Sequence, residues 1–137
     1  MKENTRSELI NLVSEFFRII SGAIDEERDW VKFRKLFTSD AKLFASVKDD
    51  LGNYTIHIWS VESYMSRLEQ FLKTNDFYEK AEKIEIDYSN KIARLTCNYI
   101  ASKTEEFSVI LKKGVNHINF IQLNDEWKII NSIWEDK

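Results

Sequence analysis

Residues 60–72 read SVESYMSRLEQFL, residues 84–99 read IEIDYSNKIARLTCNY, and the change of pattern between them decides the fold. In the first stretch, apolar side chains recur every three or four positions, which predicts a helix with one buried face. In the second, apolar and polar residues alternate, which predicts two β-strands joined by a tight turn at Asn90-Lys91. The chain therefore changes from helical to extended structure near its middle.

The flanking regions extend this division. Apolar residues at helical spacing predict a helix over residues 9–24 and a shorter one over residues 30–37. Strands are expected at residues 41–47, 54–59, 107–111, 115–123 and 127–134. Because one face of each strand is polar, the sheet is expected to be antiparallel with one buried side. Three helices against such a sheet give an α+β fold.

Length and composition limit the possible classes of protein. A chain of 137 residues predicts a single domain over residues 1–137. The apolar fraction of 43% is too high for a disordered chain. The net charge of −3 comes from 23 acidic and 20 basic residues that are interspersed, so no basic stripe for phosphates is present and nucleic acid is not expected as a partner.

Neither a membrane segment nor a metal site is indicated by the sequence. No apolar run approaches the roughly 18 residues that span a bilayer, and no secretory leader is recognisable near Met1. A cytoplasmic location is therefore expected. Cys97 is the single cysteine, which excludes an intramolecular disulfide. The two histidines lack the spacing of metal ligands, so we expect no metal and no cofactor.

Three runs of residues resemble a known superfamily. SVESY at residues 60–64, NFIQL at 119–123 and WKIINSIWED at 127–136 are similar to the signature runs of NTF2-like proteins, and most similar to the uncharacterised bacterial SnoaL-like group. The resemblance covers roughly residues 7–136. It implies a strongly curved sheet that wraps the third helix as a cone, with an aromatic-lined pocket at the open end. It also implies a homodimer formed through the outer face of the sheet.

The catalytic residues of the superfamily's known enzymes transfer poorly to this sequence. Ketosteroid isomerases carry a general base five residues after the aspartate that corresponds to Asp40, and that position is Ala45 here. Asp87 and Arg94 resemble the acid and arginine of limonene epoxide hydrolases, but both alternate with apolar residues, which predicts an exposed ion pair instead. His117 is a weak catalytic candidate, and His57 is a weaker one.

A pair of asparagines is the strongest polar candidate for ligand binding. With a three-residue turn at Asn124-Asp125-Glu126, Asn119 faces Asn131 on the side of Trp127, which is expected to be the cavity side. A buried amide needs a hydrogen-bonding partner, which a ligand, water or the other asparagine of a structural pair supplies. With a two-residue turn, Gln122, Phe120 and Ile118 take that side instead.

Aromatic residues supply the remaining candidates. Phe44, Trp59, Tyr64 and Tyr99 are expected either to contact a ligand or to fill the core. Trp134 is expected on the outer sheet face, where a dimer interface would bury it.

Three functions remain open. The protein is a module that binds a small apolar or aromatic molecule in its cone, a cofactor-independent isomerase, lyase or hydrolase acting by acid–base chemistry, or a dimeric assembly domain with a filled cone. Binding ranks first, because the sequence assigns no carboxylate to an inward strand position.

Overall fold

The protein folds as three helices and six strands in a computed structural model that describes residues 3–137. The helices are α1 (Glu3–Ile20), α2 (Trp30–Lys35) and α3 (Val61–Leu72). The strands are β1 (Phe37–Lys48), β2 (Tyr54–Ser60), β3 (Tyr78–Tyr88), β4 (Ile92–Ser102), β5 (Ile110–Leu123) and β6 (Glu126–Asp136). The α+β class and the three helices are confirmed. The first helix ends four residues earlier than its apolar pattern predicts, and Ile24 beyond it is exposed.

All six strands form one sheet in the order β2-β1-β6-β5-β4-β3. The β1–β6 pair is parallel and every other pair is antiparallel. The prediction of two separate strands at residues 107–111 and 115–123 is wrong. They are replaced by the single strand β5, which runs through Gly114 without a turn.

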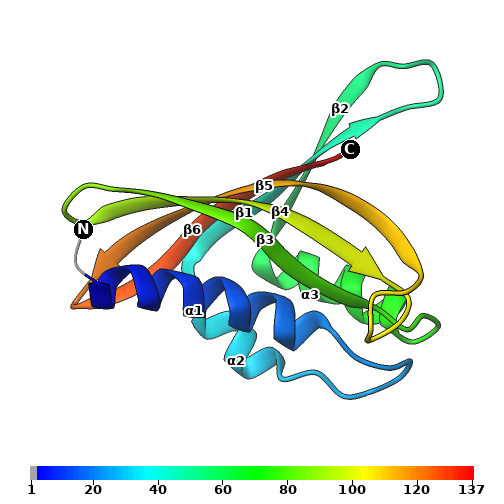
Figure 1. The fold of residues 1–137 in the computed structure, drawn as a ribbon, viewed down its shortest axis with the longest axis horizontal. Coiled ribbons are helices and arrows are strands. Elements are labelled where there is room, and N and C mark those ends of the chain that lie inside the picture. The colour runs from blue at the N-terminus through cyan, green and yellow to red at the C-terminus, as the bar shows by residue number, and fades with distance from the viewer. Residues whose placement is uncertain (1–2) are drawn as a thin grey trace.

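The helices cover one face of the curved sheet (Figure 1), with α1 packed mainly on β3 and α3 on β1 and β2. Helix α3 begins where the Ser60 side chain accepts a hydrogen bond from the backbone N–H of Ser63 at 3.1 Å, a standard N-cap. Its buried face carries Tyr64, Met65 and Leu72. The strands therefore curve around residues 60–72.

An aromatic cluster fills the closed part of the cone. Phe33 of α2 is fully buried, with its ring centroid 5.1 Å from those of both Phe16 and Phe37. Tyr64 stacks on Phe33 at 6.2 Å and marks the boundary of this packing. Beyond Tyr64 the side chains no longer close the space between α3 and the sheet.

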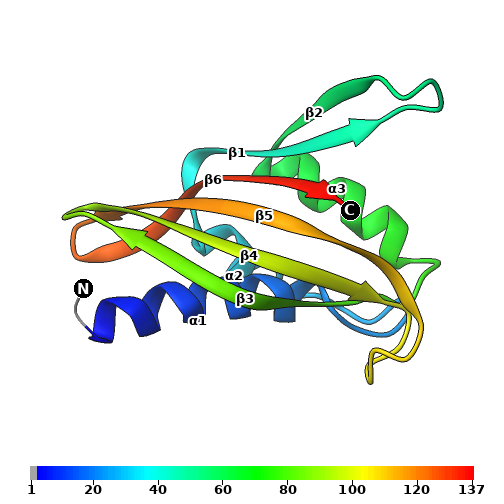
Figure 2. The same ribbon diagram turned by 45° about the horizontal axis from the view of Figure 1, so that its top comes forward.

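Strands β1 and β2 form a hairpin that extends past the body of the protein (Figures 1 and 2). Its turn contains Gly52 at φ 85°, a conformation that glycine adopts without strain. The outer side of the hairpin is apolar: Ile56 and Ile58 are 59% and 57% exposed. This surface lies on the same sheet as the cavity but on the opposite face.

Candidate functional site

A cavity of about 820 Å³ occupies the open end of the cone. It lies between α1, α3 and the inner face of the sheet. Its walls are mainly aromatic, formed by Phe16, Phe17, Trp59, Phe71, Phe77 and Trp134. A volume of this size falls within the range of small-molecule pockets. The cone is therefore not filled by its own side chains.

A β-bulge in β3 turns a carboxylate into this cavity. Glu82 pairs with Asn98 and Glu85 with Thr96, so β3 carries one extra residue against β4. Lys83 takes up the extra residue at φ 50°. Because one inserted residue reverses the inward and outward faces of a strand, Glu79 lies on the same side as Ile84. Glu79 lines the cavity, and the sequence analysis missed it.

The environment of Glu79 favours the protonated acid. Burial raises the pKa of its carboxyl to about 7; the positive charge of Lys112 opposes the rise, and the negative charge of Asp136 adds to it. Its backbone is fixed, because the Glu79 N–H donates to Ser21 Oγ at 2.9 Å. Within residues 3–137, no group forms a hydrogen bond with the Glu79 carboxyl. The backbone of Glu79 is thus held in place, and its acid group is free to contact a ligand.

A tyrosine–aspartate pair lies beside Glu79. The Tyr99 hydroxyl of β4 donates to Asp136 Oδ1 of β6. Lys112 Nζ lies 3.7 Å from the same Asp136 oxygen. Burial, followed by the bond to Asp136, raises the pKa of Tyr99 well above its usual value, so the phenol stays protonated. The ring crosses β5 at Gly114, where any Cβ would approach the Tyr99 hydroxyl closer than 3.0 Å.

Two buried side chains offer further polar groups to the cavity. Ser132 Oγ donates to Asn116 Oδ1 at 2.8 Å, which occupies the amide oxygen and leaves the amide nitrogen for another partner. Asn116 is only 4% exposed and lines the cavity. Burial, with the charge of Glu79 as a smaller cause, raises the pKa of Tyr64 far above its usual value. Its neutral hydroxyl has no hydrogen-bond partner in the described part of the chain.

A second bulge, in β6, corrects the expected position of Trp134. Asn119 pairs with Asn131 but Phe120 pairs with Ile129, so Ile130 is an extra residue. The residues after it change face, and Trp134 lines the cavity. Its ring stacks on Trp59 at 5.8 Å with an interplanar angle of 8°. The expectation that Trp134 lies on the outer sheet face is wrong.

The asparagine pair forms, but on the opposite side. Asn119 Nδ2 donates to Asn131 Oδ1 at 2.8 Å. The turn has two residues, because Leu123 pairs with Glu126 and both Asn124 and Asp125 have positive φ. Buried Ile118 and Phe120 therefore face inward, as the alternative register requires. Asn119 and Asn131 lie in a shallower outer depression, so their placement in the cavity is wrong.

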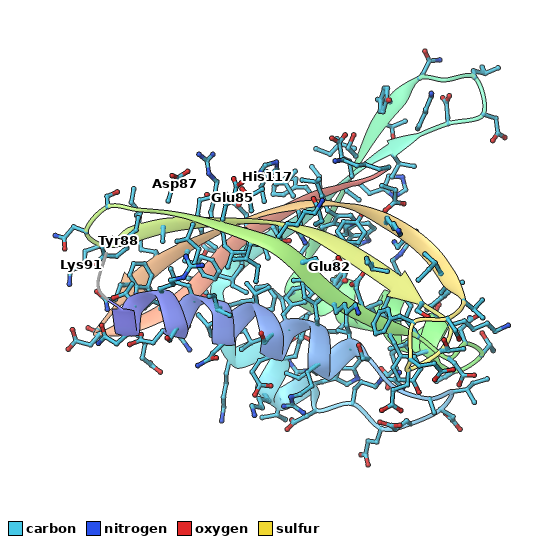
Figure 3. All side chains as sticks on the ribbon, viewed as in Figure 1. Glu82, Glu85, Asp87, Tyr88, Lys91 and His117 are labelled. Atoms are coloured by element: carbon cyan, nitrogen blue, oxygen red, sulfur yellow. The ribbon has the colours of Figure 1, made fainter. Side chains whose placement is uncertain are left out.

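Two further candidates also lie outside the cavity. His117 is exposed, and its Nδ1 is 3.0 Å from Thr96 Oγ1; Figure 3 shows it with Glu85 and Asp87 on the side of the sheet away from α1. Phe44 faces outward because its neighbours in β1, Leu43 and Ala45, are buried on the inner face. The expected roles of His117 and Phe44 in the cavity are therefore wrong.

The other candidates lie where the sequence predicts. Trp59, Tyr64 and Tyr99 line the cavity, and His57 reaches its rim. Arg94 Nη2 lies 3.3 Å from Asp87 Oδ2 in an exposed ion pair, which confirms the surface interpretation.

The described residues hold neither a reactive thiol nor a metal cluster. Burial raises the pKa of the Cys97 thiol to about 12 and keeps it unreactive. Among residues 3–137, no three histidine, cysteine or acidic side chains gather as metal ligands. None of the described helices is long and apolar enough to cross a membrane.

Similar proteins are recognisable by structure and not by sequence. No family model matches the chain, and no curated protein matches it. A protein of unknown function with a cystatin-like fold from Nostoc punctiforme superposes with a TM-score of 0.77 at 14% identity, covering 100% of this chain and 94% of its own. An NTF2-like protein of unknown function from Pseudomonas putida gives 0.73 at 12% identity, with 98% and 88% covered.

A third solved structure is that of a subunit. The beta subunit of a putative aromatic-ring-hydroxylating dioxygenase from Novosphingobium aromaticivorans gives a TM-score of 0.74 at 12% identity, covering 98% of this chain and 90% of its own. Likeness at such low identity establishes the fold and leaves the function open. The chain has the NTF2-like fold, an α+β cone of the cystatin-like type.

Proposed function

We propose that this protein is a cofactor-independent enzyme that moves a proton on a small apolar or aromatic molecule bound in the cone, with Glu79 as the general acid or base. The observation that carries the proposal is the Glu79 carboxyl, which lines the cavity without a hydrogen-bond partner in the described chain. Binding without catalysis ranked first on the sequence because no inward carboxylate was assignable. Glu79 reverses that order.

The acidity of Glu79 suits proton transfer near neutral pH. A general acid or base works best when its pKa lies close to the working pH, and the pKa of Glu79 is raised to about 7. The neighbouring Tyr64 hydroxyl and Asn116 amide nitrogen can donate hydrogen bonds to an oxygen of the substrate. Donors fixed in position stabilise negative charge that develops on such an oxygen. Isomerisation and elimination beside a carbonyl are reactions that need this set of groups.

The walls of the cavity define the size and nature of the substrate. About 820 Å³ lined by tryptophan and phenylalanine rings accommodates a drug-sized molecule with one or two rings. Apolar contact supplies affinity in such a pocket, while a few polar groups fix orientation. This supports an apolar or aromatic substrate over a highly charged one.

Hydrogen–deuterium exchange at carbon tests the proposal without knowledge of the natural substrate. A panel of aryl ketones is incubated with the protein in D₂O, and loss of the proton next to the carbonyl is followed by NMR. The wild type is expected to accelerate exchange for at least one ketone, and Glu79→Gln is expected to abolish the acceleration. Glu85→Gln, an exposed change on the same strand, is the matched control and is expected to exchange at the wild-type rate.

Two results contradict the proposal. Exchange that is no faster than in buffer, together with saturable ketone binding, identifies a binding protein. Exchange that survives Glu79→Gln assigns the chemistry to another group.

We also propose that the protein forms a homodimer through the outer face of the sheet. Phe44 and the exposed side chains of Ile56, Ile58 and Ile133 lie on this face of β1, β2 and β6. Exposed apolar patches on a soluble domain commonly mark contact surfaces. Light scattering of the wild type and of Ile58→Glu tests the proposal.

A further inference from the structure

The cavity contains one cation that is not matched by an acid. Its charged lining residues are Arg67, Lys112, Glu79 and Asp136. Lys112 lies 3.7 Å from Asp136, and its charge acts on the Glu79 carboxyl, so it is already balanced. Arg67 has no ion pair and no side-chain hydrogen bond within residues 3–137. Its guanidinium is therefore available to an anion.

Arg67 is exposed at the rim of the cavity and contacts an aromatic ring there. The guanidinium carbon lies 5.1 Å from the ring centroid of Trp59, within the range of a cation–π contact. Trp59 is in turn stacked on Trp134, so the ring beneath Arg67 is itself fixed. A guanidinium above a ring keeps its N–H groups in its own plane, where they can bind both oxygens of a carboxylate. Arg67 on the Trp59 ring can therefore act as an anion clamp.

The charges of Arg67 and Glu79 both reach the hydroxyl of Tyr64, where they act in opposite directions. Arg67 follows Tyr64 by three positions, so the two side chains share a face of α3. A ligand that contacts both Arg67 and Glu79 therefore lies within reach of the Tyr64 hydroxyl, which lines the same cavity.

We infer that the ligand of this cavity is a small aromatic or conjugated carboxylic acid whose carboxylate binds Arg67 at the rim while its apolar body extends toward Glu79. The inference rests on the proposed function, because it concerns the substrate of the same cavity. It assigns to Arg67 the choice of anionic over neutral ligands.

Paired acids and amides of the same shape test this assignment. Binding of 2-naphthoate, 2-naphthamide, cinnamate and cinnamamide is measured by calorimetry and by quenching of tryptophan fluorescence. We expect each acid to bind about tenfold more tightly than its amide in the wild type, since a charge-assisted bidentate contact replaces a neutral one. Arg67→Gln is expected to reduce the preference to less than about twofold, and Arg67→Lys to retain part of it.

A control variant separates the local contact from general charge. Arg94→Gln removes the same charge from the outer sheet face and is expected to keep the tenfold preference. Equal affinity of acids and amides in the wild type overturns the inference, and so does a preference that survives Arg67→Gln. Absence of binding by all four probes also overturns it.

These outcomes are independent of the test of Glu79. Ketone exchange that requires Glu79 leaves the proposed function standing even when acids show no preference. Acid binding that requires Arg67 leaves the anion clamp standing even when no exchange occurs.

Discussion

Gly114→Ala tests how the strands position the polar side of the cavity. A Cβ at this position would lie closer than 3.0 Å to three atoms: the Glu135 carbonyl oxygen, the Tyr99 hydroxyl oxygen and the ring carbon that carries this hydroxyl. Real Cβ atoms essentially never approach so closely, so the Tyr99 ring has to leave its place over β5. The substitution should therefore break the hydrogen bond between Tyr99 and Asp136.

The magnitude follows from two contributions. Overpacking of a close-packed site costs about 1–3 kcal/mol. Loss of a hydrogen bond to a charged acceptor costs about 1.5–3 kcal/mol. Because relaxation relieves part of each, we expect Gly114→Ala to lower the free energy of unfolding by about 3–5 kcal/mol.

Urea unfolding followed by circular dichroism measures this loss. Tyr99→Phe removes the hydroxyl without adding an atom and is expected to cost less than Gly114→Ala. Lys113→Ala, an exposed change on the same strand, is expected to stay within about 0.5 kcal/mol of the wild type. A free energy of unfolding for Gly114→Ala within about 1 kcal/mol of the wild-type value would show that the Tyr99 ring does not pack over β5 at Gly114.

Three further changes test other parts of the structure. Below pH 4.5, the ordinary pKa of a glutamate, the Glu79 carboxyl is protonated in both the folded and the unfolded protein. Between pH 4.5 and about 7 it ionises in the unfolded protein and stays protonated in the folded one, so the free energy of unfolding falls as the pH rises. Relative to the wild type, Glu79→Gln should therefore raise the free energy of unfolding in urea by about 1–3 kcal/mol more at pH 8 than at pH 5. A difference between variant and wild type that is the same at both pH values would contradict this prediction. Phe33→Ala should cost about 3–5 kcal/mol, because Phe33 is fully buried among aromatic rings; a loss below 1 kcal/mol would argue against this packing. Light scattering should show a dimeric wild type and a monomeric Ile58→Glu, and a wild type that is monomeric at high concentration would exclude the outer-face interface.

The elements of the fold are readable from the sequence because they follow from regular periodicity. The apolar stripe on residues 61–72 predicts α3 with the bounds that the structure shows. The alternation of residues 84–99 predicts the β3–β4 hairpin with its two-residue turn at Asn90-Lys91. Both are local patterns that the burial of one face imposes directly.

The candidate site depends on irregularities that periodicity does not show. The bulge at Lys83 turns Glu79 inward, and the bulge at Ile130 turns Trp134 inward and Asn131 outward. Each inserts one residue and reverses every side chain beyond it. The alternating pattern in the sequence begins at Ile84, so it does not predict that Glu79 lies in the cavity. No residue type at either bulge signals its presence.

Some of the predicted site residues do not depend on a bulge. Trp59 is near the end of β2 and Tyr64 is in the first turn of α3, so both lie where the strand leads into the helix, and their ring centroids are 6.0 Å apart. Tyr99 follows from the alternation of β4, in which Leu95 and Cys97 are buried on the same face. Asn116 could have been found by the same alternation along β5, with Ile118 and Phe120 as its buried neighbours.

The most direct test of the proposed chemistry is the titration of Glu79 itself. Protein labelled with ¹³C at the glutamate carboxyl is titrated by NMR, and the Glu79 signal is assigned by its disappearance in Glu79→Gln. We expect a midpoint at about 7, which moves when a ligand fills the cavity. A midpoint at the ordinary value of 4.5, unaffected by ligand, would show that Glu79 is an ordinary solvated carboxylate and would exclude its proposed role as acid or base.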